Sequence, residues 1–194
     1  MDEVGAAPLP VTISDPQVMR ALAHPARLGI MEHLGSTGDS VTATECAEVV
    51  GLSPSATSYH LRALARYGLV EQAPGRGDAR ERRWRSTAHA WRIDSRSDAE
   101  PETRAAEKVL IEAFVTRDFE RVRDWVRRMP DEPREWYDAA ALTGTVLFCT
   151  ADELRDLNDA LHRLLEPYKR LNRRSTEVPG ARPVVIHYAA LPQD

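Results

Sequence analysis

A run of hydrogen-bonding side chains with almost no charge lies in the stretch SPSATSYH, from Ser53 to His60. Hydroxyl and imidazole groups both donate and accept hydrogen bonds, whereas a helix that only faces water usually carries charged residues on its outer side. Such a face suits the base edges in the major groove of DNA, because it adds neither bulk nor negative charge. The positions expected to contribute are Ser53, Ser55, Ala56, Thr57, Ser58, Tyr59 and His60.

Positive charge that could hold a polyanion follows directly along the chain. Residues 60–96 contain nine arginines and four acidic residues, a balance of +5, whereas residues 97–194 contain fifteen basic and nineteen acidic residues, a balance of −4. The net charge of −4 for the whole chain therefore conceals a basic region in the first half. The arginines expected to neutralise phosphates are Arg62, Arg66, Arg76, Arg80, Arg82 and Arg83.

The elements that must position these side chains are predicted from capping residues and apolar spacing. Helices are predicted from residue 14 onward, over 25–34, over 43–50 and over 53–67. The strand-like residues 69–73 and 82–86 flank a turn that contains Gly and Pro, which predicts a β-hairpin. Two short helices joined by a tight turn at Gly51 and followed by such a hairpin predict a winged helix-turn-helix. The serine-rich helix would be its recognition helix.

Two stretches of this region, ALAHPARLGIMEHL (21–34) and LSPSATSYHLRALARYGLVE (52–71), resemble the signature stretches of ArsR-type winged-helix transcription regulators. The resemblance covers roughly residues 15–86. It implies a homodimer that binds double-stranded operator DNA and represses transcription until a signal relieves it. Ser58 and Tyr59 stand where the family commonly has Ser-Arg before His-Leu, so the resemblance does not determine the base preference.

The sequence does not favour a metal sensor. Many members of that family bind metal through a Cys-x-Cys pair, which would fall near Thr42 and Thr44, and Thr is a poor ligand for soft metals. The two cysteines, Cys46 and Cys149, lie far apart in apolar stretches and are interpreted as reduced, buried thiols. Asp159, His162 and Glu166 share one face of a predicted helix, which is interpreted as a solvated face. No metal and no cofactor are expected.

The chain is expected to divide into a flexible arm (1–13), the winged helix-turn-helix domain (14–96) and a C-terminal dimerisation or effector module (97–194). In that module the apolar spacing predicts a long amphipathic helix over 102–129 and a second helix over 150–171. Residues 139–148 and 183–188 are predicted to form strands. The fold class is therefore α+β and mainly α: a winged helix-turn-helix, a long helix and a small α/β module.

The leading hypothesis is a cytoplasmic, homodimeric DNA-binding regulator, a repressor with a non-metal effector such as a small molecule. The sequence contains no phosphate-cradling Gly loop, nucleophile elbow or paired catalytic carboxylates, so no enzyme is predicted. It contains no apolar run of membrane-spanning length and no secretion signal at MDEVGAAPLP. Two alternatives stay open: a winged-helix protein-interaction module, or a ligand-binding C-terminal domain with secondary DNA binding.

Overall fold

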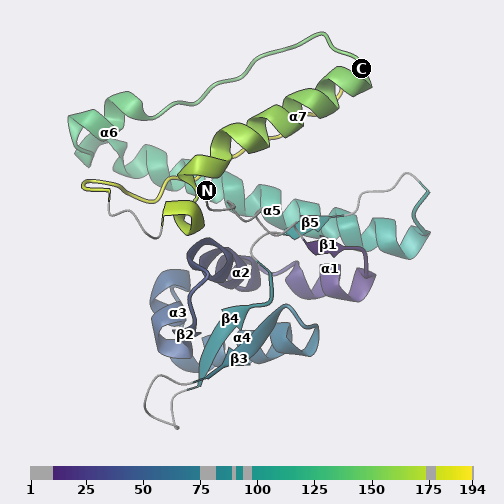
Figure 1. Ribbon diagram of the computed structural model, residues 1–194, viewed down its shortest axis with the longest axis vertical. Helices are drawn as coiled ribbons and strands as arrows, with labels where there is room; N and C mark the ends of the chain where they lie inside the picture. The colour runs from purple at the N-terminus through teal and green to yellow at the C-terminus, as the bar shows by residue number, and fades with distance from the viewer. Residues whose placement is uncertain (1–10, 75–81, 89–90, 94–97, 174–177, 194) are drawn as a thin grey trace, which may run out of the picture. The chain divides into compact units, whose positions relative to one another are not determined.

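The computed structural model describes residues 11–74, 82–88, 91–93, 98–173 and 178–193 (Figure 1). The described residues are mainly helical, as the sequence predicts, and they also form two small sheets. The chain divides into two compact units, residues 1–117 and 118–194, and each is described by itself. None of the described helices is both long enough and apolar enough to span a bilayer.

Four short helices build the first unit, and each begins where the sequence supplies a side-chain cap. Helices α1 (Pro16–Leu22), α2 (Pro25–Thr37) and α4 (Pro54–Arg66) each have proline in the first turn, where its missing N–H costs no hydrogen bond. Helix α3 (Ala43–Val50) begins at a capping box and ends at Gly51, which adopts a left-handed conformation at φ 67°. The predicted winged helix-turn-helix is therefore confirmed, including the breaks before Pro25 and at Gly51.

The wing is a three-stranded antiparallel sheet in the order β2-β4-β3, formed by β2 (Val41–Thr42), β3 (Val70–Ala73) and β4 (Arg83–Ser86). Strand β2 pairs with β4, so the sheet includes the residues just before α3 as well as the hairpin. A second, parallel pair joins β1 (Val11–Ile13) to β5 (Trp91–Ile93). Residues 11–13 were expected in a flexible arm; the structure instead gives them a strand partner 80 residues away.

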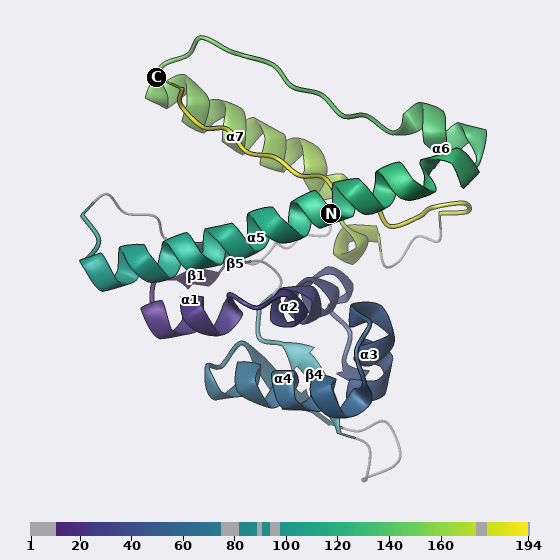
Figure 2. The same ribbon diagram turned by 180° about the vertical axis from the view of Figure 1, so that it is seen from behind.

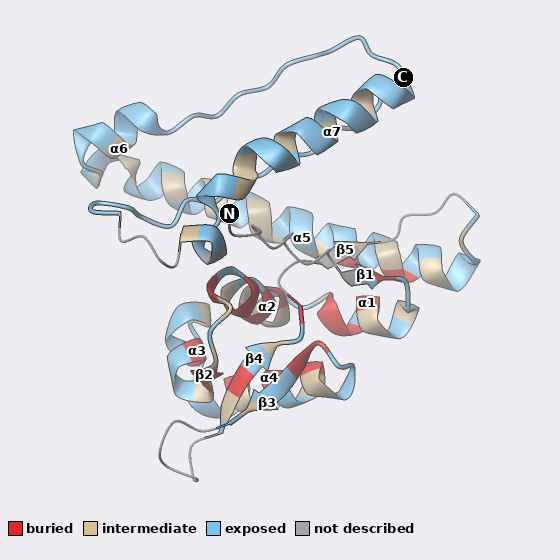
Figure 3. Cartoon of the chain, viewed as in Figure 1, coloured by how far each residue is buried: buried red, intermediate tan, exposed pale blue. Residues whose placement is uncertain are grey.

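The hydrophobic core lies entirely in the first unit, where the buried residues of Figure 3 gather. It contains side chains from α2, α4 and the wing, such as Ile30, Leu61 and Trp84, and it extends to Leu110 of helix α5 (Pro101–Arg128). The sequence placed a domain boundary between residues 96 and 97. The structure instead packs the first half of α5 into the core of the DNA-binding fold, because Ala106 and Leu110 are buried there.

The second unit contains the end of α5 from residue 118, helix α6 (Arg134–Ala139), helix α7 (Ala151–Leu165) and three turns of 3-10 helix, at Met129–Asp131, Glu166–Tyr168 and Arg170–Arg173. Helix α7 begins at the predicted capping box, in which Thr150 and Glu153 exchange hydrogen bonds. It was predicted to continue to residue 171. It ends at Leu165 because Pro167, which cannot donate to the α-helical ladder, follows two residues later.

The two strands predicted in this unit do not form. Residues 140–149 and 181–193 run as drawn-out segments without strand pairing, so the expected small α/β module is helical, with two such segments (Figures 1 and 2). A strand needs a neighbouring strand to satisfy its backbone, and periodicity in the sequence does not supply one. The second segment is joined to α7 by one hydrogen bond, which Tyr188 Oη donates to Asn158 Oδ1 at 3.0 Å.

Candidate nucleic-acid interface

Helix α4 presents one exposed polar stripe. Ser55, Tyr59, Arg62 and Arg66 follow one another at intervals of four, three and four residues, and all four are exposed. Tyr59 is the most prominent, with 59% of its surface accessible. The helix contains no acidic residue, so nothing along the stripe repels a phosphate. The stripe therefore offers hydroxyl groups over its first half and positive charge over its second half.

The first turn of α4 is used partly for its own stability. The hydroxyl of Ser53 accepts a hydrogen bond from the backbone N–H of Ala56 at 3.2 Å, so this side chain is the N-cap, while its exposed O–H can still donate. Ala56 and Ser58 are half-buried. Arg62 Nε donates to the carbonyl oxygen of Ser58 at 3.2 Å, which leaves the rest of its exposed guanidinium turned to solvent.

Two residues expected to read bases face the interior instead. Thr57 is fully buried and His60 retains 8% of its surface, so neither lies on the exposed stripe. Thr57 falls four and seven residues before Leu61 and Leu64, which is the spacing of the buried face. The prediction that these two side chains contact bases is therefore wrong. They pack between the helix and the core.

His60 packs against His24 in the preceding helix pair. Its ring packs against the ring of His24, with 4.6 Å between the centroids, and His24 Nδ1 in turn caps α2 by accepting from the N–H of Ala26. Burial lowers the pKa of His60, and the nearby His24 and Arg27 lower it further. The neutral imidazole is the form that fits this position. The His-Pro pair at residues 24 and 25 was the available signal, since it marked the start of α2.

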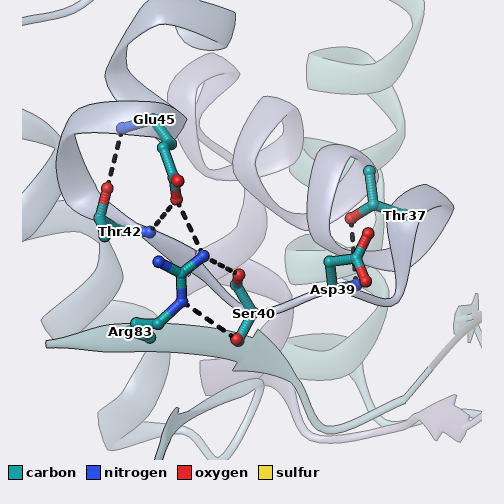
Figure 4. Close-up of polar contacts among 6 residues, drawn as sticks. All are labelled: Thr37, Asp39, Ser40, Thr42, Glu45 and Arg83. Carbon is teal, nitrogen blue, oxygen red and sulfur yellow. Dashed lines mark hydrogen bonds and ion pairs between the residues drawn. The ribbon is translucent and has the colours of Figure 1, made fainter. Parts of the chain in front are cut away.

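The wing is fixed to the recognition motif by Arg83 (Figure 4). Its Nη2 atom donates to the carbonyl oxygen of Ser40 at 2.6 Å and lies 3.3 Å from Glu45 Oε2, while its Nε donates to Ser40 Oγ at 3.2 Å. Glu45 also accepts from the N–H of Thr42 at 2.7 Å, and this bond, with the charge of Arg83, lowers the pKa of Glu45. Only 16% of the Arg83 side chain is exposed. Arg83 was expected to bind phosphate; it is instead bonded within the fold.

The remaining arginines of the wing differ in their exposure and in their partners. Arg82, next to Arg83, is exposed. Arg85, which the sequence analysis did not assign to the site, forms an ion pair with Glu71 on the neighbouring strand at 2.6 Å. Arg76 and Arg80 lie outside the described residues. Of the six expected phosphate-binding arginines, Arg62, Arg66 and Arg82 are therefore the ones that the structure places on the described surface.

The positions considered for metal have other partners. Thr42 is the N-cap of α3, and Glu166 forms an ion pair with Lys169 at 2.5 Å. Within the described ranges, no three His, Cys, Asp or Glu side chains are grouped as metal ligands. Cys46 is buried, as expected, and burial raises the pKa of its thiol to about 11. Cys149 was expected to be buried and is exposed, because the segment that carries it packs against no other element.

Comparison with known proteins agrees with the fold of the first unit. A family model described as "Helix-turn-helix domain" matches residues 22–73, which run from the end of α1 through α4 to the end of β3. The matched part is therefore the region that carries the exposed stripe and the first strand of the wing hairpin. No protein in the curated collection matches the chain.

Solved structures with a similar arrangement include a mutant of ZitR from Lactococcus lactis, with 16% identity, a TM-score of 0.32, and coverage of 75% of each chain. The PcaV transcriptional regulator from Streptomyces coelicolor, solved with its natural ligand, shares 15% identity over 75% of this chain and 76% of its own, with a TM-score of 0.32. The YusO protein of Bacillus subtilis shares 15% identity over 78% and 83%, with a TM-score of 0.33. At these values the likeness carries no argument about function.

Proposed function

We propose that this protein is a sequence-specific DNA-binding transcriptional regulator of the ArsR type, a repressor that acts as a homodimer. The observation that carries the proposal is the exposed stripe on α4, in which Ser55 and Tyr59 precede Arg62 and Arg66 and no acidic residue intervenes. A helix of this kind fits the major groove, with its first turns at the base edges and its arginines at the backbone.

Roles within this surface are assigned by position and charge. Ser55 and Tyr59 occupy the first two turns of α4 and would contact bases, whereas Arg62, Arg66 and Arg82 would contact phosphates. Arg76 and Arg80 are proposed as further wing contacts on their sequence alone. A homodimer would place two such helices in successive major grooves, about 34–36 Å apart. A small-molecule effector is proposed on the family resemblance alone.

The test is a fluorescence-anisotropy titration on the promoter fragment of the protein's own gene, with a random duplex of equal length as reference. Tyr59→Ala should weaken binding to the specific fragment by about 1–3 kcal/mol and leave random DNA nearly unchanged. Tyr67→Ala is the matched control, since Tyr67 is also exposed but caps the other end of α4. Wild-type binding no tighter than to random DNA at moderate salt would contradict the proposal.

One observation favours a second function for the same motif. Val49 and Leu52 are exposed on either side of the turn between α3 and α4, and apolar side chains at that point suit a protein partner. A winged-helix interaction module would not depend on the arginines. The charge reversal Arg82→Glu separates the two functions: it should abolish most DNA affinity in a regulator, and unchanged DNA affinity would favour the interaction module.

A further inference from the structure

The second unit lacks a core of its own. None of its described residues is buried, although α7 carries leucines at three- and four-residue spacing and the two drawn-out segments are rich in Val, Leu, Ile and Phe. Folded units of comparable length normally bury a large part of their apolar surface. This unit therefore has the apolar side chains of a core, but other side chains do not bury them.

The first segment has the features of an unpaired β-strand. Residues 141–149 are all exposed, and across this fully described stretch no backbone group makes a hydrogen bond. In an extended chain, Leu142, Val146 and Phe148 fall on one face with Gly144, and Thr143, Thr145 and Leu147 fall on the other. An exposed strand edge of this kind is a template for pairing with another strand.

The second segment repeats these features. Val184, Ile186 and Tyr188 alternate with Val185 and His187, and the backbone of 183–190, also described throughout, makes no hydrogen bond. Neither stretch contains Asp, Glu, Lys or Arg, so no charge pattern selects a foreign partner. Each copy of the chain carries both stretches, and a two-fold arrangement would use each of them twice.

The uncovered area is large enough for a stable dimer. Eleven large apolar residues of the segments and α7 are exposed: Leu142, Val146, Leu147, Phe148, Leu157, Leu164, Val184, Val185, Ile186, Tyr188 and Leu191. At roughly 100 Å² each, they offer on the order of 1,000 Å², whereas a standard interface needs about 800 Å² from each partner.

We propose that residues 141–149 and 183–190 pair with the same segments of a second copy of this chain and form a β-sheet between the two copies. The sheet would satisfy the open backbone groups, and its apolar face would cover the leucines of α7. This inference rests on the proposed dimeric regulator and names the surface that joins its subunits. It also explains why the strand-like sequence of both segments is unpaired within one chain.

The test uses the full chain without DNA, so that it does not depend on operator binding. Sedimentation velocity gives the mass of the particle over a dilution series, and hydrogen–deuterium exchange followed by mass spectrometry reports the amides of residues 142–148. We expect a dimer whose amides in this segment exchange at least tenfold more slowly than in the dilute single chain. Alkylation of the exposed Cys149 should slow in parallel, with the buried Cys46 as internal control.

Two variants at one position isolate the backbone pairing. Thr145→Pro removes an N–H that makes no bond within the chain, so it should leave the single-chain fold intact but weaken self-association at least tenfold and remove the amide protection. Thr145→Val keeps the N–H and favours strand geometry, so it should leave both intact or strengthen them. Circular dichroism of each variant checks the fold.

Three results would overturn the inference. The first is a single-chain mass at every concentration. The second is a dimer whose segment 142–148 exchanges as fast as in the single chain, or whose affinity Thr145→Pro does not change, because another surface would then join the copies. The third is amide protection that persists in the dilute single chain, because the pairing would then be internal. In the second and third cases, specific DNA binding by a dimer would still support the proposed function. In the first case, specific DNA binding would support a DNA-binding regulator but not a homodimer.

Discussion

Arg82 and Arg83 are adjacent and carry the same charge, but replacing each by Ala is expected to affect a different property of the protein. Arg83 is bonded to Ser40 and Glu45 and is mostly buried, whereas Arg82 is exposed. Arg83→Ala should therefore lower the free energy of unfolding, and Arg82→Ala should instead lower the affinity for DNA. Both variants change the net charge by the same amount, so each is the control for the other.

The size of the stability effect follows from the bonds of Arg83. A hydrogen bond from a charged donor to the Ser40 carbonyl contributes about 1.5–3 kcal/mol. The contact with Glu45 adds less than about 1 kcal/mol, because half of the Glu45 side chain is exposed to solvent. Arg83→Ala should thus cost about 2–3 kcal/mol in total. Arg82→Ala should stay within about 0.5 kcal/mol of the wild type, as is usual for an exposed position.

Urea unfolding followed by circular dichroism measures the first effect as a shift of the midpoint at unchanged slope. The second effect is read from the salt dependence of binding, where Arg82→Ala should reduce the slope of log K against log salt by about one. Equal loss of stability in the two variants would refute the assignment of Arg83 to the fold. So would an Arg83→Ala variant that unfolds at the wild-type midpoint.

Two further predictions concern the stability of helices α3 and α4. Thr42→Ala removes the hydroxyl that caps α3 and should cost about 1 kcal/mol in the free energy of unfolding, measured by urea titration, whereas Thr44→Ala, at an exposed position in the same helix, should cost less than half of that. Because burial lowers the pKa of His60 in the folded state, the stability it contributes should be complete above its ordinary pKa of 6.5 and be lost as the pH falls through the lowered value. Unfolding midpoints from pH 8 to 5 should decline less in His60→Gln than in the wild type, and an equal decline in both would contradict the burial argument.

The sequence was sufficient where local chemistry determines the structure. The caps at Ser53, Thr42 and Thr150, the left-handed Gly51 and the apolar spacing of α4 are local features, and helices α3, α4 and α7 begin where these features predict. The winged helix-turn-helix could be predicted for the same reason, because its elements are short and consecutive. Tertiary packing added only details within it, such as the strand at residues 11–13.

The site was less predictable because chemical type does not distinguish outward from inward faces. Thr57 and His60 have the same polar character as Ser55 and Tyr59, yet they lie on the buried side of α4. Arg83 is a wing arginine like Arg82, and only the pairing of β2 with β4 brings it to Ser40 and Glu45. In the second unit, the strand-like periodicity predicted two strands that do not form, because periodicity does not supply the neighbouring strand that pairing requires.

The uncovered segment at residues 141–149 has a consequence for the lifetime of the protein in the cell. Proteases bind substrates as extended chains, and exposed backbone without hydrogen bonds is where nicking concentrates. A chymotrypsin-like protease would find Leu147 and Phe148 there, both exposed. If the proposed pairing covers this stretch, copies that have found a partner escape cleavage and single copies do not. Turnover would then remove unassembled chains first, and the amount of protein would rise steeply once synthesis exceeds the concentration needed for assembly.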